Sequence, residues 1–267
     1  SKATRFSDQA VIRLQKSAPS GTILIDAPAT CNAMSREMVQ QMIDALSDFH
    51  QDKSVRCVIL TAKGTSFCSG VNLKEWQSQS KQRDAIEQWH RVASELRELI
   101  ESMLRLPKPI IAAIDGPVLG FGLTMALACD LVVTSPKAEF EVPSSRHGLV
   151  SGLTVPLAAF RLGASFASRL VLGGQRIDAK GALALGLSHR EVDSDQIWAA
   201  AHEWTLKIAE SSAESVQLGK RLLNEMVGES LLMNLSSGAA VLATACSTES
   251  ATEGLEAFVS KRQAKFP

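Results

Sequence analysis

The 267-residue sequence predicts an α/β protein in which helices cross over between the strands of a mostly parallel sheet. Apolar segments of strand length alternate with segments of helical periodicity as far as about residue 155. The segment 55–60 is almost continuously apolar, as strands buried on both faces are, and 110–114 is a further apolar strand segment. Apolar residues make up 45% of the chain, which is enough for one large core.

The predicted elements follow in order along the chain. Segments 11–14 and 22–25 are expected to be strands, and a helix is expected to begin after Ser35, whose hydroxyl suits an N-cap. The strand at 55–60 precedes a long helix, which ends at Leu106 because the residue before Pro107 disfavours helical torsions. The packed side of that helix is expected to carry Ile86, Trp89, His90, Ala93, Leu96, Ile100 and Met103.

A strand at 110–114, a helix at 121–129 and a strand at 138–142 complete the alternating region. Beyond about residue 155 the pattern predicts helices only, and several of them carry apolar faces. These apolar faces could pack against other subunits, or the helices could form a cap on the same subunit.

Composition excludes several classes of function. Lys+Arg and Asp+Glu number 28 each, so no global charge favours nucleic acid, and no apolar run reaches the length of a membrane helix. The five cysteines are scattered, without the pairing typical of a disulfide framework or a metal site. We therefore expect no metal and no membrane or nucleic-acid partner, and a cytoplasmic location.

Two glycine-containing segments lie where a strand gives way to a helix. These are Ser66–Glu75, with Gly70, and Gly116–Asp130, with Gly120 and Gly122. The first N–H groups of a helix lack internal partners, so such turns can hold an oxygen that gains negative charge. The same glycines could instead serve only tight turns and close helix packing.

Together with several other motifs, these two segments make the sequence resemble the enoyl-CoA hydratase/isomerase (crotonase) superfamily over nearly the whole chain. The resemblance implies a crotonase-like ββα spiral core (residues 1–195) and a C-terminal helical trimerisation region (196–267) that forms part of the CoA site, both acting as one functional unit. It also implies an acyl-CoA substrate and a homotrimer or homohexamer. The other motifs are 32–34, 106–115, 161–163, 172–179, 184–187 and 258–266.

The resemblance assigns roles to individual residues. The backbone N–H groups of Val71 and Phe121 correspond to the oxyanion hole, which holds a thioester oxygen as it becomes an enolate. No cofactor is implied beyond the CoA moiety of the substrate. The residues expected around that moiety are Ala33, Cys68, Ser69, Gly70, Asn72, Leu73, Lys74, Gly120, Phe258 and Lys261. For each lysine, a solvated surface charge is the alternative.

Two positions at which hydratases of the superfamily carry glutamate hold Thr124 and Ser144 here. A third position, where some isomerases and hydrolases carry aspartate, is Gly152. A hydroxyl cannot replace a carboxylate as a base near neutral pH. We therefore expect isomerase, hydrolase or decarboxylase-type chemistry rather than hydration, with bound bicarbonate as one replacement for a carboxylate. The alternative is an acyl-CoA-binding protein without turnover.

Other ionisable groups near the motifs are weaker candidates. Glu141 could act as a base, although it or Glu139 is expected to face solvent or pair with Arg146. His147 titrates in a useful range but is more often structural in such a position. The remaining candidates are Ser145, Arg146, the thiol of Cys68, and Glu87 and His90 on the long helix.

Overall fold

The computed structural model describes residues 11–81, 84–226 and 228–267. Its strands are β1 (Ile12–Ser17), β2 (Ser20–Ile25), β3 (Cys57–Ala62), β4 (Ile110–Ile114), β5 (Pro117–Leu119), β6 (Leu131–Thr134), β7 (Glu139–Glu141), β8 (Ile177–Asp178) and β9 (Arg190–Glu191). Its α-helices are α1 (Arg36–Gln51), α2 (Leu73–Ser80), α3 (Ala85–Arg105), α4 (Phe121–Ala128), α5 (Thr154–Leu162), α6 (Ala164–Val171), α7 (Ala179–Ala184), α8 (Ile197–Ala209), α9 (Ala213–Arg221), α10 (Glu229–Cys246) and α11 (Glu249–Val259). Shorter helical turns are η1 (Pro28–Thr30), η2 (Ser144–His147), η3 (Ser194–Gln196) and η4 (Leu222–Met226).

The main sheet has the strand order β1-β2-β3-β4-β6-β9, and all its neighbours except β1 and β2 pair in parallel. Leu60, Ala112 and Val132 lie in register across its centre. The chain crosses over through α1, then α2 and α3, then α4, which confirms the predicted α/β class. A second sheet has the order β5-β7-β8, and its first strand, β5, begins three residues after the end of β4.

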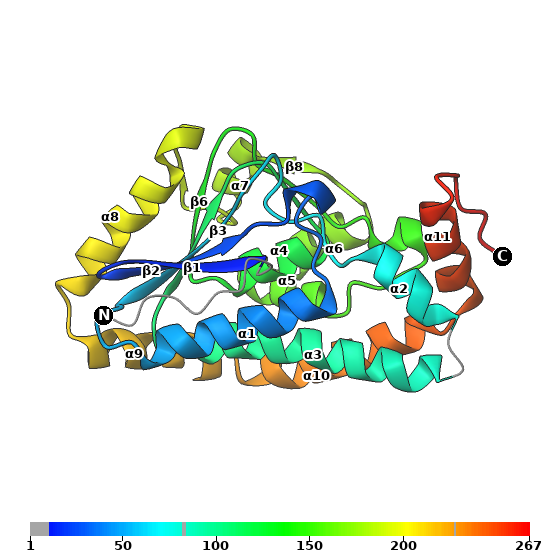
Figure 1. Cartoon of the computed structure of the whole chain (residues 1–267), viewed down its shortest axis with the longest axis horizontal. Coiled ribbons are helices and arrows are strands. Elements are labelled where there is room, and N and C mark those ends of the chain that lie inside the picture. The colour runs from blue at the N-terminus through cyan, green and yellow to red at the C-terminus, as the bar shows by residue number, and fades with distance from the viewer. Residues whose placement is uncertain (1–10, 82–83, 227) are drawn as a thin grey trace.

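Alternation along the central strands divides the core between the two faces of the sheet. Val58 and Leu60 belong to the larger hydrophobic cluster, whereas Cys57 and Ile59 pack in a smaller one with Ile197 and its neighbours on α8. Figure 1 shows α8 on one side of the sheet and α1, α3 and α10 on the other. The predicted division after residue 195 therefore falls just before a helix that covers the sheet.

The limits of the first two long helices follow from the predicted signals. The Ser35 hydroxyl accepts a hydrogen bond from the Met38 N–H (3.2 Å) at the start of α1, and α3 ends immediately before Leu106. The predicted packed side of α3 is wrong at two positions: Ile86 is 65% exposed, and His90 is exposed. His90 follows the buried Trp89 by one residue, which rotates it about 100° away from the apolar stripe, and Ile86 lies in the first turn.

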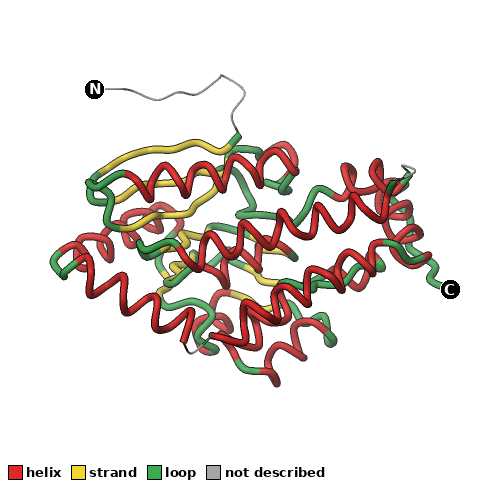
Figure 2. The backbone as a smooth tube through the Cα atoms, turned by 90° about the horizontal axis from the view of Figure 1, so that it is seen from below, coloured by secondary structure: helices red, strands yellow, loops and turns green. Residues whose placement is uncertain are grey.

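The expectation of helices only beyond residue 155 is also wrong, because β8 and β9 lie there. Each has only two residues, too few to produce a periodic signal. The C-terminal helices do cover their own chain: α10 packs along α3 and α5, and α11 packs against α2 and η2. Figure 2 shows the long helices α1, α3 and α10 running side by side.

No single helix in the described part of the chain is long and apolar enough to cross a membrane. One bent pair, Ala213–Glu225 with Ser230–Cys246, meets the length and composition test when the two helices are taken together.

Candidate active site

Two glycine turns meet backbone to backbone at the start of α4. Gly70 has φ +105°, and Gly120, the N-cap of α4, has φ +52° and ψ −116°. A Cβ placed on Gly70 would lie 3.3 Å from the Leu119 carbonyl oxygen and 3.7 Å from the Phe121 nitrogen. Only glycine adopts these torsions readily, and its lack of a side chain permits the close approach of the two turns.

The turns leave two neighbouring N–H groups without acceptors. The Met34 N–H donates to Gly70 O (2.8 Å) and the Asn72 N–H donates to Met34 O (2.9 Å), so the Val71 N–H faces away from Met34. Phe121 is the first residue of α4, and its N–H has no partner within the helix. Among the hydrogen bonds of the described residues, neither N–H is a donor. Both are therefore available to a ligand oxygen.

A pocket with a cavity volume of about 50 Å³, partly open to solvent, adjoins Val71 and Phe121. In the described part of the chain, none of the side chains that line it is ionisable. The lining residues are Val71, Trp76, Leu96, Phe121, Thr124, Ser144, Leu149, Val150, Ser151, Gly152, Leu153, Thr154 and Leu242. The predicted Val71, Phe121, Thr124 and Ser144 thus all lie in one pocket.

Hydroxyl pairs occupy the two positions that the resemblance aligns with glutamates. The Thr124 Oγ1 lies 2.8 Å from the Thr154 Oγ1 and 3.4 Å from the Gly120 carbonyl oxygen. The Ser151 hydroxyl donates to the Ser144 Oγ at 2.6 Å. Each position therefore holds a neutral hydroxyl that is already hydrogen bonded to a hydroxyl of the 151–154 segment.

Gly152, which the resemblance aligns with the aspartate of some isomerases and hydrolases, is closed off by α10. A Cβ on Gly152 would lie 2.0 Å from the Gly238 carbonyl oxygen, and the reverse contact of Gly238 with Gly152 is equally tight. Real Cβ atoms do not approach a carbonyl so closely. No side chain fits at residue 152 while α10 keeps this position.

The model of the enoyl-CoA hydratase/isomerase family matches residues 17–267. The chain belongs to this family. It is 31% identical over 251 residues to the mitochondrial enoyl-CoA hydratase domain-containing protein 2 of Bos taurus, covering 91% of this chain and 83% of that protein. The human protein of the same name is 30% identical, with 91% and 84% covered.

Solved structures of the family share the fold described above. An enoyl-CoA hydratase/isomerase from Xanthobacter autotrophicus Py2 superposes with a TM-score of 0.86 at 25% identity, covering 97% of this chain and 99% of that chain. An enoyl-CoA hydratase/isomerase from Pseudoalteromonas atlantica T6c gives 0.83 at 27% identity, with 97% and 100% covered. The fold is therefore the crotonase fold.

The candidate replacement bases lie outside the pocket. Glu141 is 3% exposed, and its carboxylate accepts from Arg146 Nη1 (2.5 Å) and Arg176 Nε (2.9 Å). This confirms the expected pairing with Arg146 and adds a second guanidinium. The His147 ring packs edge-on against Phe258, and burial, with a contribution from the charge of Arg146, lowers the pKa of His147. Neither side chain lines the pocket.

The remaining nucleophile and base candidates lie in unsuitable surroundings. Cys68 is fully buried, and burial raises the pKa of its thiol to about 12 although the Gly70 N–H donates to the sulfur. Glu87 and His90 are exposed on α3, and Glu87 pairs with Arg91 at 3.3 Å. The structure thus brings none of these three into the pocket.

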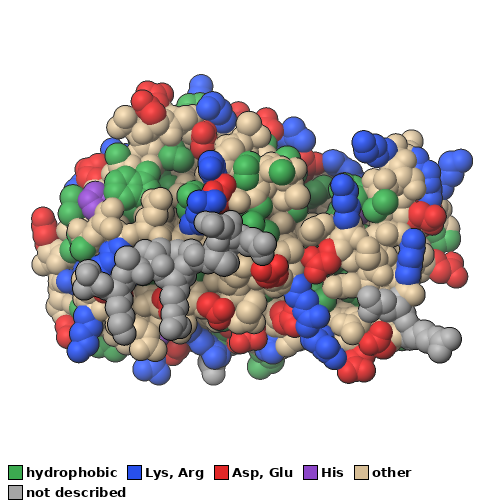
Figure 3. Space-filling model, in the orientation of Figure 1, with side chains coloured by type: hydrophobic (Ala, Val, Ile, Leu, Met, Phe, Trp, Pro, Cys, Tyr) green, Lys and Arg blue, Asp and Glu red, His purple; other side chains and the backbone are tan. Residues whose placement is uncertain are grey.

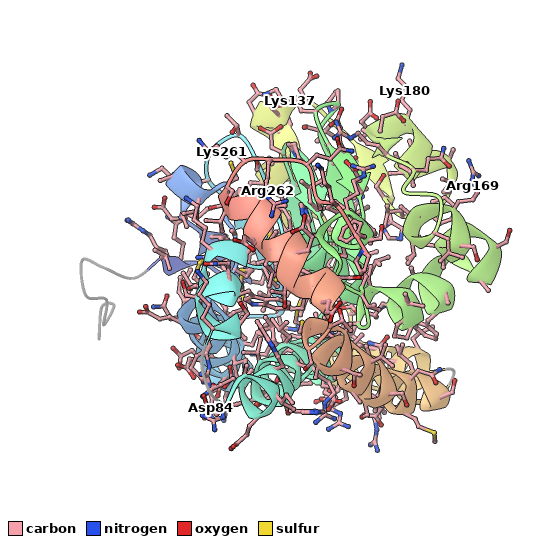
Figure 4. All side chains as sticks on the ribbon, turned by 90° about the vertical axis from the view of Figure 1, so that its right-hand side faces the viewer. Asp84, Lys137, Arg169, Lys180, Lys261 and Arg262 are labelled. Atoms are coloured by element: carbon pink, nitrogen blue, oxygen red, sulfur yellow. The ribbon has the colours of Figure 1, made fainter. Side chains whose placement is uncertain are left out.

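The residues expected around CoA lie along the loop before α2 and at the end of α11. Asn72 caps α2 by accepting from the Glu75 N–H (3.3 Å), and Lys74, two residues after Asn72, is exposed. Phe258 is exposed on α11, and Lys261 lies just beyond the end of that helix (Figure 4). Because α11 packs against α2 of the same chain, these groups belong to one end of the molecule, where Figure 3 shows several Lys and Arg side chains.

The other predicted CoA-site residues are less exposed. Ala33, Ser69 and Leu73 are half-buried, and the Ser69 N–H donates to the Cys31 carbonyl oxygen (3.1 Å). Gly70 and Gly120 are buried in the paired turns.

Several residues of the pocket were not predicted from the sequence. Trp76 lies on α2, Ser151 and Thr154 flank Gly152, and Leu242 comes from α10. The run of hydroxyl residues around Gly152 was a visible signal for two of them. Nothing local in the sequence marks Leu242, because its place depends on how α10 folds back over the core.

Proposed function

We propose that this chain binds acyl-CoA thioesters with the carbonyl oxygen between the N–H groups of Val71 and Phe121. The support is that neither N–H group donates a hydrogen bond to any described residue and that Val71 and Phe121 both line the pocket. Two donors aimed at an oxygen that becomes an enolate stabilise it strongly, because removing one such donor costs about 3 kcal/mol in other enzymes. The CoA moiety then extends toward Lys74 and Lys261, and no further cofactor is needed.

The chemistry we favour is decarboxylation of a malonyl-type thioester. Hydration and isomerisation require a group that removes or delivers a proton, and none of the described residues that line the pocket is ionisable. Loss of CO₂ needs no base. The electrons of the broken carbon–carbon bond form the enolate, whose oxygen the two N–H groups hold, and the α carbon then takes a proton from water.

The pocket supports this choice in two further ways. Its apolar walls, among them Trp76, Leu96 and Leu242, favour neutral CO₂ over the carboxylate from which it forms. The hydroxyls of Thr124 and Ser144 can orient that carboxylate by hydrogen bonds, and they could equally hold bicarbonate. Thioester hydrolysis is less well supported because it requires an activated nucleophile.

The test combines turnover with binding on the purified chain. Malonyl-CoA, methylmalonyl-CoA, crotonyl-CoA and 3-hydroxybutyryl-CoA are each incubated with and without bicarbonate, and products are followed by mass spectrometry. Calorimetry with butyryl-CoA measures binding. We expect CO₂ release and weak or no hydration. Binding without turnover would instead identify an acyl-CoA-binding protein, and crotonyl-CoA hydration at rates ordinary for the family would refute the placement of the catalytic groups.

We further propose a homotrimer or homohexamer in the cytoplasm. Large apolar side chains remain exposed on the C-terminal helices, including Leu218 (55%), Met233 (70%) and Val241 (52%). The five cysteines are free thiols, which suits a reducing compartment. Light scattering that finds a stable monomer at micromolar concentration would refute the assembly.

A further inference from the structure

A partition of three side chains separates the acyl pocket from a second pocket. Val71, Trp76 and Leu96 line both, so the two spaces lie on opposite sides of the same wall. The second pocket is small, with a cavity volume of about 10 Å³. Its other lining residues are Met34, Ser35, Arg36, Val39, Glu75, Gln79, Val92 and Glu95.

The partition is held firmly. Trp76 lies on α2, five residues after Val71, and is 5% exposed. Its ring packs against Trp89 of α3, with centroids 5.3 Å apart. Leu96 comes from the same helix α3 and is 4% exposed. Two helices therefore contribute the side chains that end the acyl pocket at this side.

The space beyond the partition is lined in part by charged and amide side chains, which the described lining of the acyl pocket lacks. The Arg36 guanidinium is paired with Glu95 (Nε to Oε2, 2.6 Å), and the Glu75 carboxylate accepts from the Arg36 N–H at 3.3 Å. The Gln79 Oε1 is buried and has no hydrogen-bond partner among the described residues. A hydrocarbon chain entering this space would deprive these groups of water without replacing its hydrogen bonds.

We propose that Trp76 and Leu96 set an upper limit on the length of the acyl group, so that the chain selects short acyl thioesters. The inference rests on the proposed binding of acyl-CoA. It assigns specificity to residues other than Val71 and Phe121, whose N–H groups are proposed to hold the carbonyl oxygen. The adjoining Gln79 adds a second expectation: once the partition is shortened, a chain that ends in a hydroxyl gains more than a plain chain of equal length.

The experiment measures dissociation constants of straight-chain saturated acyl-CoA thioesters from two to ten carbons by calorimetry. In the wild type, affinity should rise by about fourfold per methylene group up to a limit and then fall. Leu96→Ala should move that limit outward by about two carbons and improve binding of the first chains beyond the old limit by about 15-fold, since two more methylene groups are accommodated. Leu96→Val should move it by a smaller step and serves if the alanine variant does not fold.

Leu99→Ala is the matched control, because Leu99 is fully buried on the same helix and lines neither pocket. It should lower stability and leave the length limit unchanged. An identical limit in the wild type and both Leu96 variants overturns the inference while leaving acyl-CoA binding intact. If the wild type binds no thioester of any length, the proposed function fails, and the inference fails with it.

Discussion

Gly120→Ala tests whether the Phe121 N–H acts on the thioester oxygen. The ψ angle of Gly120, −116°, orients the peptide that carries this N–H, and φ is +52°. A Cβ at this position meets only the Gly70 Cα, at 3.9 Å, so crowding is not the problem. The cost is torsional, roughly 1–3 kcal/mol, reduced by about 0.4–1 kcal/mol because alanine restricts the unfolded chain.

Gly163→Ala provides the control for that cost. Gly163 also has torsions that favour glycine, φ +84° and ψ 152°, and a Cβ there meets nothing within 4 Å. It joins α5 to α6 and does not line the pocket. Both variants should lose about 1–2 kcal/mol, which lowers the melting temperature by about 2–8 °C in a chain of this size. Only Gly120→Ala should disturb the site.

The assay is isotope-edited infrared spectroscopy of butyryl-CoA labelled with ¹³C at the carbonyl. Two N–H donors should lower the C=O stretching frequency on binding to the wild type and to Gly163→Ala. In Gly120→Ala the frequency should return toward that of the free thioester, and any turnover of the wild type should fall by about 10²- to 10³-fold. Equal carbonyl frequencies in all three proteins, together with equal melting temperatures in the two variants, would refute the assignment of Phe121.

Three further outcomes are expected. Crotonyl-CoA hydration by the wild type should be very weak, since each missing acid–base group is worth about 10²- to 10⁴-fold, and Thr124→Glu with Ser144→Glu should raise the rate more than either change alone; ordinary hydration by the wild type would contradict this. Gly152→Asp should lower the free energy of unfolding by more than ordinary overpacking, which costs about 1–3 kcal/mol, and so lower the urea midpoint. Gly219→Asp is the control and should have a small effect, because a Cβ there meets nothing within 4 Å. Similar midpoints for the two variants would disprove the contact with Gly238. Stability should fall as the pH drops below about 6.5, because burial lowers the folded-state pKa of His147 and the unfolded chain therefore binds more protons. Urea unfolding measured across this pH range should show a smaller loss of stability in His147→Gln than in the wild type. The same dependence of stability on pH in both proteins would contradict this prediction.

The sequence predicted most of the fold because its signals are local. Ser35 marks the start of α1, Pro107 the end of α3, and the apolar runs mark β3 and β4. His90 was wrongly predicted to lie on the packed side of α3. The apolar periodicity identifies the buried stripe but does not say whether a residue next to Trp89 lies inside the stripe or at its edge. The two-residue strands β8 and β9 are defined by their pairing partners, which no local pattern reveals.

In the candidate site, too, the residues within local motifs were predictable and those placed by distant packing were not. The four core positions Val71, Phe121, Thr124 and Ser144 could be named from motifs and lie in one pocket. The partition and the closure of Gly152 could not be predicted, because they depend on where α3 and α10 pack against segments far away in the chain. The ion pairs of Glu141 were only half foreseen, since Arg176 lies 35 residues further on.

The contact between Gly152 and Gly238 has a consequence for the order in which the protein is assembled. The residues from Val71 to Thr154 leave the ribosome well before α10, yet Leu242 and the backing of Gly152 come from that helix. Two equally close contacts tie α11 to the same loop, at Gly148 with Ser250 and at Gly254 with His147. A nascent chain that ends before α10 therefore carries an unfinished, apolar cavity around Trp76 and Leu153, the kind of surface that invites aggregation during synthesis. Truncation within α10 should thus reduce the soluble yield far more than the loss of a surface helix would.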